Sequence, residues 1–396
     1  MKPNIPILNT GAIQFVVKIT KYCNLRCKYC YEFPHLGDPT KMNLAQIELL
    51  FRQIITQYQH RNKKIFFTWH GGEPFIVGVA YYRQIFALQK QLFEAANMVF
   101  SNRIQTNLTI LDPTWIAFLK EEPFDGVSIS LDLFGGERVN IAGKPVEDKV
   151  LDNMQRLLDN GIPFGAITVL SRKTVEHALA IYQFFEDIKL SGFRFLPVHH
   201  NSFDTAENTN GLSCGEILDT YQKLFDNWLV AENSISIDPI DEYLEAAIQY
   251  LNPNPILGGY DKAHGDALFV INTDGGVYSN DYDYERLECY GNIFVDDFQT
   301  LFASAAYQRA IEASQAKIQS VCHQCEYFGY CPGYRIGEGD PEEVSWNENG
   351  ELECSVIRPL LTHMISVLKN NHLEREIFPE SFNSESSTNI IMNEVA

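Results

Sequence analysis

Three cysteines within eight residues constrain this chain more than any other feature of its sequence. Cys23, Cys27 and Cys30 follow an apolar, strand-like run from Ala12 to Ile19. A structural zinc site closes with four protein ligands, whereas a [4Fe–4S] cluster held by only three thiolates keeps one iron open to a small molecule. The alternative is a zinc loop with a distant fourth ligand, but zinc cysteines usually come in two separated Cys-x2–4-Cys pairs.

Composition and charge exclude several classes of partner. The 396 residues suffice for one large and one smaller domain, and the hydrophobic content of 45% is ordinary for a globular protein. A net charge of -20 argues against nucleic acid and against anionic membranes. Nine clustered cysteines, an odd number, indicate metal ligation in a reducing compartment. With no membrane span or signal segment in the sequence, we expect a cytoplasmic protein.

Strand and helix signals alternate through the first two-thirds of the chain. Strands are expected at Ile13–Ile19, Lys64–Trp69, Ser101–Thr106, Gly126–Ser130, Phe164–Leu170 and Gly192–Pro197. Amphipathic helices are expected at Leu44–Tyr58, Ala80–Ala95, Pro113–Lys120, Val146–Asn160 and Thr174–Ile188. This alternation implies a parallel sheet, and six βα units predict an α/β fold with a partial (β/α)6 TIM barrel. Because barrel active sites lie at the C-terminal ends of strands, the three cysteines fall where a catalytic site should be.

Candidate ligand contacts follow four successive strands. After the second strand come Gly71, Gly72 and Glu73, where glycines let the backbone approach a ligand closely and a carboxylate can accept from an ammonium group. The other candidates at or after strand ends are Gln105, Asn107, Ser130, Asp132, Arg138 and Leu170. Each could instead be ordinary strand-end polarity, and Arg138 could be a solvated loop charge.

A second cysteine group lies near the C-terminus. Beyond about residue 256 we expect a β-hairpin around Thr273-Asp274-Gly275, then the cysteines Cys322, Cys325, Cys331 and Cys354. By ligand count alone they could hold zinc or an iron–sulfur cluster. We expect a barrel domain at 1–230, a bridging region and cysteine-rich domain at 231–370, and a partly disordered tail at 371–396.

The first cysteine motif, with Tyr29 before its last cysteine, resembles the signature of the radical S-adenosylmethionine (SAM) enzymes. The resemblance implies a [4Fe–4S] cluster on Cys23, Cys27 and Cys30, with SAM on the fourth iron and a 5′-deoxyadenosyl radical as the reactive species. It also implies contacts from the chain to SAM. Gly71, Gly72 and Glu73 would hold its amino group, Ser130 and Asp132 its ribose or carboxylate, Arg138 that carboxylate and Leu170 its adenine, with Tyr29, Gln105 and Asn107 beside them.

The C-terminal cysteines resemble the SPASM extension of peptide- and protein-modifying radical SAM enzymes. The full extension has seven cysteines and two auxiliary clusters, as in anaerobic sulfatase-maturing enzymes. Here the Tyr260–Asp266 segment has no cysteine, and Asn280 and Arg335 stand at two further cysteine positions. The outer set, Cys322, Cys325, Cys331 and Cys354, is intact. We therefore expect one auxiliary [4Fe–4S] cluster in a C-terminal SPASM-like domain, and open space where the other cluster would lie.

These resemblances imply a radical SAM enzyme of oxidoreductase type that modifies a ribosomally synthesised precursor peptide, with side-chain crosslinking (cyclophane formation) as our first choice. Epimerisation, thioether formation and backbone excision are alternatives, and Cys214 and Cys289 are spare thiols. Sulfatase maturation is less expected because it resembles the two-auxiliary-cluster form. A non-enzymatic alternative is a colourless, zinc-stapled peptide-binding module. No catalytic residue is assigned.

The expected partners are the precursor peptide and a flavodoxin- or ferredoxin-like electron donor. The barrel begins within about fifteen residues of Met1, which leaves no room for a preceding winged-helix leader-binding domain. The SPASM surface, the barrel rim or a separate leader-binding protein would then recognise the leader.

Overall fold

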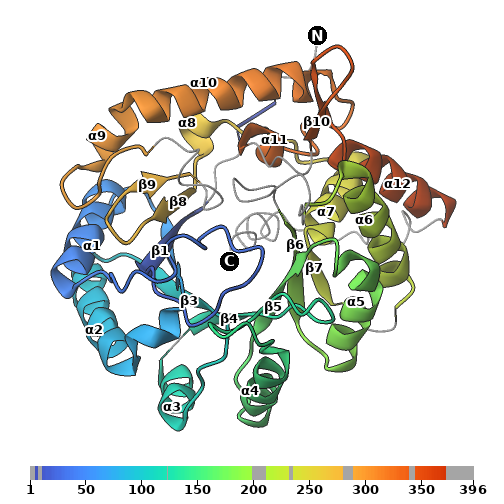
Figure 1. Cartoon of the computed structure of the whole chain (residues 1–396). Helices are drawn as coiled ribbons and strands as arrows, with labels where there is room; N and C mark the ends of the chain where they lie inside the picture. The colour runs from blue at the N-terminus through green and yellow to red at the C-terminus, as the bar shows by residue number, and fades with distance from the viewer. Residues whose placement is uncertain are drawn as a thin grey trace. The chain divides into compact units, whose positions relative to one another are not determined.

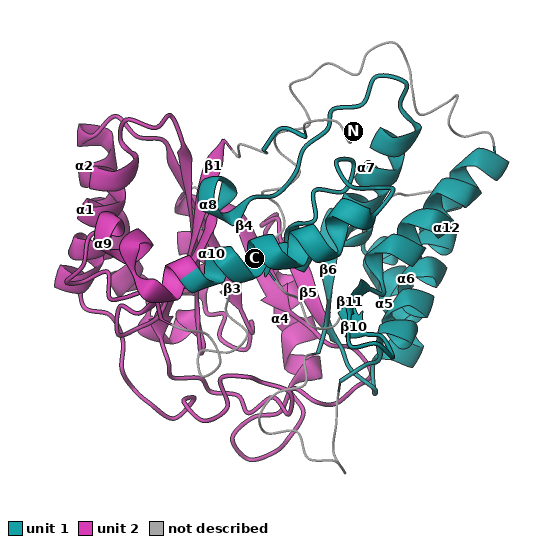
Figure 2. Ribbon diagram, turned by 90° about the horizontal axis from the view of Figure 1, so that it is seen from above, with its two compact units in different colours: residues 1–10, 169–266, 309–394 teal, residues 11–168, 267–308, 395–396 magenta. Residues whose placement is uncertain are grey.

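The structure is a computed structural model that describes residues 5–7, 11–122, 124–198, 211–231, 235–279, 289–338 and 344–371. The chain divides into two compact units (Figure 2). Unit 2 comprises Gly11–Thr168, Ala267–Gln308 and Val395–Ala396, and unit 1 comprises Met1–Thr10, Val169–Asp266 and Arg309–Glu394. The expected domain boundaries at 230 and 370 stay predictions. Asn280 and most of the expected disordered tail lie outside the described residues.

Parallel strands form the core of unit 2. Its strands are β1 (Ala12–Thr20), β2 (Lys64–Gly71), β3 (Phe100–Thr106), β4 (Phe124–Ser130), β8 (Leu268–Ile271) and β9 (Val277–Tyr278), in the order β4-β3-β2-β1-β8-β9. The first part of β5 (Gly165–Leu170) pairs in parallel with β4. The expected hairpin is confirmed as antiparallel β8 and β9. Its first strand also extends the parallel sheet beside β1, which the sequence did not predict.

Helices cover the outer side of these strands in Figure 1. They are α1 (Leu44–Tyr58), α2 (Val79–Ala95), α3 (Pro113–Glu121) and α4 (Glu147–Asp159). Unit 2 also contains the short helices η1 (Pro74–Val77) and α9 (Phe298–Ala303). Between helices and sheet lies an aromatic core in which Phe15, Phe51, Phe67 and Trp69 have no exposed surface. Burying side chains of this size is the largest favourable contribution to folding.

Unit 1 combines a short parallel strand pair with a helical layer. Strand β6 (Gly192–Pro197) runs parallel to β7 (Ser236–Asp238). The helices are η2 (Val175–His177), α5 (Ala178–Asp187), α6 (Cys214–Leu229), α7 (Ile240–Leu251), α8 (Lys262–Gly265), η3 (Cys322–Gln324), α11 (Tyr334–Glu338) and α12 (Ile357–Asn370). An antiparallel pair, β10 (Val344–Trp346) and β11 (Leu352–Cys354), completes it. Helix α10 (Ala305–Ser320) runs from unit 2 into unit 1.

The predicted fold class is confirmed as mixed α/β with a parallel sheet at its core. The sequence missed β7, α10 and the β10–β11 pair, which are short or only weakly patterned. In the described part of the chain, no helix has the length and apolar character that crossing a membrane requires.

The start of α1 offers a test of this local structure. Asn43 and Gln46 form a capping box, in which each side chain accepts from the other residue's backbone N–H. Replacing Asn43→Ala should lower the free energy of unfolding by about 1 kcal/mol, because it leaves a helix-terminal donor unpaired. Asn227→Ala, the same change on the exposed face of α6, should shift it by less than about 0.5 kcal/mol. Urea denaturation measures both, and equal effects would contradict the capping role.

Candidate cofactor site

The C-terminal ends of β1 and β2 are joined through main-chain contacts that only glycine permits. The Gly72 N–H donates to the Thr20 carbonyl oxygen at 2.8 Å. A Cβ atom on Gly71 would lie 2.2 Å from the oxygen of Thr20, and one on Gly72 would lie 2.4 Å from that of Tyr22. The sequence suggested that these glycines admit a ligand. The structure shows that the neighbouring strand end makes the close approach, and so fixes the chain just before Cys23.

The three cysteines of the first motif lie together in the loop that follows β1. Cys23 and Cys27 are buried and Cys30 packs against the same apolar cluster. Burial is the main cause that raises the pKa of all three thiols, to about 12 for Cys23. The Cys27 thiol raises the pKa of Cys23 and of Cys30 further. The motif therefore forms one buried group of interacting thiols.

This donor set fits an iron–sulfur cluster better than a zinc ion. In the part of the chain that the structure describes, no three His, Cys, Asp or Glu side chains are already arranged to hold a metal ion. The fit rests instead on chemistry, since three thiols share one loop and the Leu25 N–H donates to Cys23 Sγ at 3.3 Å. Three thiolates can hold a [4Fe–4S] cluster that keeps one iron open, whereas structural zinc needs a fourth protein ligand. The ligand roles remain predictions.

The path of this cysteine loop is set by main-chain bonds to the segment after β4. The Arg26 N–H donates to Val139 O at 2.7 Å, and the Lys28 N–H donates to Glu137 O at 3.1 Å. The two segments thus run side by side within unit 2. Arg138, which lies between these two acceptors, is thereby fixed near the cysteines.

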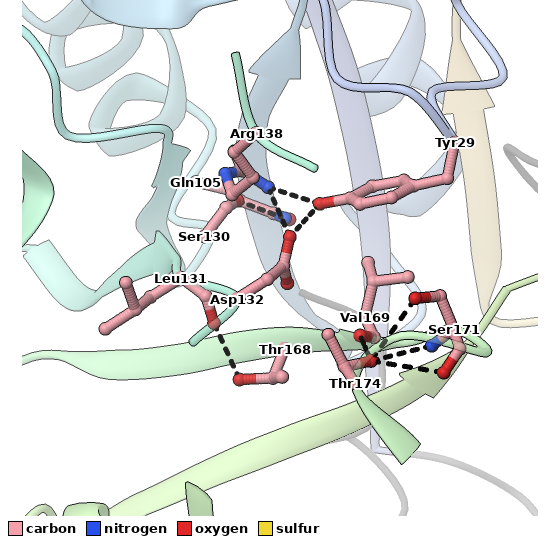
Figure 3. Close-up of polar contacts among 10 residues, drawn as sticks. All are labelled: Tyr29, Gln105, Ser130, Leu131, Asp132, Arg138, Thr168, Val169, Ser171 and Thr174. Atoms are coloured by element: carbon pink, nitrogen blue, oxygen red, sulfur yellow. Dashed lines mark hydrogen bonds and ion pairs between the residues drawn. The ribbon is translucent and has the colours of Figure 1, made fainter. Parts of the chain in front are cut away.

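Tyr29, Asp132 and Arg138 point toward one another (Figure 3). The Tyr29 hydroxyl hydrogen-bonds to the Asp132 carboxylate, and Arg138 Nη1 donates to that hydroxyl at 2.8 Å. Arg138 also pairs with Asp132 at 3.5 Å, with side-chain exposures of 12% and 0%. The alternative of a solvated loop charge at Arg138 is therefore wrong. Its Nε is buried with no hydrogen-bond partner among the described residues, so it can donate to an acceptor on a bound ligand.

Glu73 is held by the chain itself. It is fully buried, and its carboxylate accepts from Phe75 N at 2.8 Å, Thr106 Oγ1 at 2.7 Å and Asn107 N at 2.7 Å. Burial raises the pKa of Glu73, and the backbone donors partly offset this rise. The carboxylate therefore links the end of β2 to the end of β3. Its predicted contact with an ammonium group stays a prediction.

Asn107 reaches the cysteine loop directly. Its Nδ2 lies 3.8 Å from Cys23 Sγ and donates to Asn24 Oδ1 at 2.9 Å. Asn24 in turn donates to Thr109 Oγ1 at 2.8 Å. The sequence singled out Asn107 but missed Asn24 and Thr109. The position of Asn24 between two of the cysteines was the one sequence feature that could have indicated its place in the site.

The remaining predicted contacts are less closely engaged. Gln105 Nε2 lies 3.5 Å from Ser130 Oγ, at the limit of a hydrogen bond. Figure 3 places both beside Asp132. The carbonyl of the preceding residue, Leu131, accepts a hydrogen bond from Thr168 Oγ1. Leu170 is fully buried at the end of β5 and belongs to unit 1. Its role as an adenine contact stays a prediction.

A buried ion pair lies next to the cysteine loop, and the sequence analysis did not predict it. Lys18 on β1, 1% exposed, donates to Glu32 Oε1 at 2.7 Å and to the Tyr31 hydroxyl at 3.0 Å. Thr273 Oγ1 donates to the Lys18 carbonyl at 2.7 Å. The pair therefore anchors the segment that directly follows Cys30 to the middle of the sheet. A single lysine in an apolar strand does not indicate which acidic residue will pair with it, so Glu32 could not be identified from the sequence.

The C-terminal cysteines also form one group, within unit 1. Cys322 is buried against Ile318 and Ile336, with Cys354 beside it. Burial, then the nearby Cys354 and Cys325, raises the pKa of Cys322 to about 12. Burial, with a further contribution from Cys354, also holds the pKa of Cys331 well above its usual range. This four-thiol set fits a second cluster, and its ligand roles are predictions too.

Charged side chains occupy two of the positions where the sequence suggested open space. Lys262, in the Tyr260–Asp266 segment, is 2% exposed and pairs with Asp266 and Glu338. Arg335 is 8% exposed and pairs with Glu242. Both positions are therefore filled by buried, paired side chains, and the expected space near the barrel mouth stays a prediction.

Comparisons with known proteins give a family match over part of the chain. Residues 17–185 match the family model of the Radical SAM superfamily. The cysteine-type anaerobic sulfatase-maturating enzyme of Clostridium novyi is 26% identical over 319 residues, covering 78% of this chain and 83% of its own length. The serine-type enzyme of Bacteroides thetaiotaomicron is 28% identical over 355 residues, covering 81% and 83%.

Two solved structures share the fold. Native anSMEcpe with bound AdoMet and Cp18Cys peptide has a TM-score of 0.73 at 21% identity, covering 92% of this chain and 99% of that chain. Streptococcus suis SuiB bound to precursor peptide SuiA has a TM-score of 0.57 at 15% identity, covering 84% and 74%. The arrangement of the strands that carry the site is thus shared with both.

The Lys18–Glu32 pair yields a second test. Replacing Lys18→Met should lower the free energy of unfolding by about 3–5 kcal/mol, because Glu32 would keep a buried charge without its cation. The double replacement of Lys18 and Glu32 by methionine should recover most of that loss. Lys223→Met, which breaks an exposed pair with Asp219, should cost less than about 1 kcal/mol. Thermal and urea unfolding measure all three, and no recovery in the double variant would refute the pairing.

Proposed function

We propose, from the premise that this chain is a radical SAM enzyme with its radical SAM domain at residues 17–185, that it abstracts a hydrogen atom from a side chain of a peptide substrate. The observation that carries the proposal is the buried group of three thiols with the unpaired Nε of Arg138 in the same unit. Cys23, Cys27 and Cys30 would hold a [4Fe–4S] cluster, which together with SAM would supply a 5′-deoxyadenosyl radical.

The chain's own residues would bind and orient SAM. Arg138, already aligned by Tyr29 and Asp132, would donate its Nε–H to the carboxylate of SAM as a charge-assisted hydrogen bond. Glu73 would accept from the amino group while its bonds to Thr106 and Asn107 hold it in place. The burial of these groups excludes water, which strengthens each of these polar contacts.

For the reaction we propose crosslinking of two side chains within a ribosomally synthesised precursor peptide. Support comes from the likeness to SuiB, whose structure holds a precursor peptide, and from the four C-terminal cysteines, which would hold one auxiliary [4Fe–4S] cluster. After one hydrogen atom has been abstracted, bond formation releases one proton and one electron, and these cysteines would hold the redox centre suited to accept that electron. A flavodoxin- or ferredoxin-like donor would supply the first electron, and a separate protein could present the leader.

A second candidate is oxidation of a cysteine or serine in a protein substrate. The observation that favours it is the set of anaerobic sulfatase-maturating relatives, which align with about four-fifths of this chain. The charged residues at 262 and 335 weigh against it, since the full two-auxiliary-cluster pattern of those enzymes is not present here.

The product separates the two candidates. The enzyme should be co-expressed with the short reading frame beside its gene, and in parallel incubated with a sulfatase-derived peptide. Crosslinking should remove two hydrogen atoms from the precursor and abolish fragmentation between the joined residues in tandem mass spectrometry. Sulfatase-type oxidation would instead give an aldehyde that reacts with a hydrazide probe. An unchanged mass with inverted stereochemistry would indicate epimerisation and overturn the crosslinking proposal.

Metal content provides a further test. Anaerobically reconstituted protein should hold close to eight irons per chain and no tightly bound zinc, because three thiolates plus SAM satisfy one cluster and four thiolates another. Replacing Cys23, Cys27 and Cys30 by alanine should leave about four irons and abolish 5′-deoxyadenosine formation. Cys214→Ala is the control and should change neither value. Normal SAM cleavage by the triple variant would overturn the site assignment.

A further inference from the structure

Two ion-pair groups in unit 1, one buried and one partly buried, lie around the short helix α11. The first joins α11 to the segment before β8, since Lys262 Nζ lies 2.9 Å from Glu338 Oε2 and 3.1 Å from Asp266 Oδ2. These three side chains are only 2%, 8% and 7% exposed. The Tyr260 hydroxyl donates to Glu338, and burial keeps the pKa of Tyr260 well above its usual range, so that it remains a donor.

The second group ties α11 to β7 and α7. Arg335 Nε donates to Glu242 Oε2 at 2.9 Å, and its Nη2 lies 3.5 Å from Asp238 Oδ1. Arg194 on β6 adds a further cation, 3.4 Å from Asp238. Three cations thus face four carboxylates across the two groups. Removing Lys262 would take the cation away from two buried carboxylates, which is strongly destabilising.

Helix α11 in turn contacts the loop of C-terminal cysteines. Its Ile336 packs against Cys322, and the Tyr260 N–H donates to the Pro332 carbonyl at 2.9 Å. A Cβ atom on Gly333 would lie 2.8 Å from Cys322 Sγ, so the loop packs directly against the thiol. The position of α11 therefore sets the position of the residues around Cys331.

The residues in these ion pairs do not fit a further iron–sulfur cluster. Such a cluster needs thiolate ligands, and the described residues at 260–266 and 334–338 include none. Lys262 is engaged by two carboxylates. Arg335 carries a guanidinium that has no lone pair to give a metal.

We propose that Lys262, Glu338 and Arg335 form a metal-independent staple that holds the 258–266 segment to α11, and that they act as positioning residues for the loop carrying Cys331. These ion pairs would thus hold the segment and the helix together without a metal. In the full SPASM pattern, the ligands of a second auxiliary cluster would hold this region together. The proposal rests on the proposed function only for the identity of the metal that the C-terminal cysteines bind.

Hydrogen–deuterium exchange on the full chain tests the staple, with iron-free and reconstituted protein compared. The amides of Gly258, Tyr260 and Gly337 donate within this region, to Gly329, Pro332 and Gly333 respectively. Their protection should be the same with and without iron. Protection that appears only after iron is bound would overturn the proposal, and this comparison needs no variant.

Two substitutions test the positioning role. Lys262→Met and Arg335→Met should each lower protection at these amides by at least about tenfold. In the Cys23, Cys27 and Cys30 alanine background, each should also lower the iron held at the C-terminal site and alter its electron paramagnetic resonance signal. Glu338→Gln, which keeps the side-chain shape, should give a smaller change in the same direction. Arg358→Met, which breaks an exposed contact with Glu326 at 3.9 Å, is the control and should change nothing.

Unaltered protection and iron content in both methionine variants would show that the ion pairs do not position the loop. Failure of the proposed function would look different. SAM cleavage would then be absent while the exchange pattern of the iron-free chain stayed as expected, so the two failures can be told apart.

Discussion

The main-chain contact between the ends of β1 and β2 is the constraint on which the rest of the site depends. Gly71 and Gly72 bring the second strand's end against Thr20 and Tyr22 at distances that no side chain allows. This contact sets where the chain enters the cysteine loop, and places Glu73 where it can accept from both Thr106 and Asn107. Three strand ends thus become one rigid edge. A preorganised edge of this kind is what holding a small cofactor in one orientation requires.

Much of the fold could be predicted from sequence because its signals are local. The helix from Leu44 to Tyr58 follows from its apolar period and from the Asn43 cap, and the structure confirms both ends. The pairing of β8 with β1 could not be predicted, since more than 240 residues separate the paired positions. The sequence of a strand also does not indicate which other strand will pair with it. Local pattern identifies elements, whereas register across long separations depends on the tertiary packing.

The candidate site divides along the same line. Cys23, Cys27 and Cys30 carry their chemistry in their spacing, so the thiol group was predictable. The pairing of Lys18 with Glu32 was not predictable, because a buried ion pair depends on two side chains meeting in space. Lysine and glutamate are also usually exposed, so neither residue type indicates burial. Arg138 shows the intermediate case. Its location after β4 suggested a ligand contact, but only the structure reveals that Tyr29 and Asp132 align it and leave its Nε unpaired.

The backbone bonds from Arg26 and Lys28 to the segment after β4 bear on how such a site can change over evolution. A main-chain hydrogen bond places no demand on the side chain that carries it, except that the donor cannot be proline. Substitution of Lys28 can therefore leave its main-chain bond in place, whereas Arg26 also holds the loop through its side chain, which donates to the Cys23 and Leu25 carbonyls. The shape of the loop then depends on its backbone bonds together with this one side chain. Relatives share only about a quarter of their residues with this chain, and a contact made through the main chain can tolerate divergence of that degree.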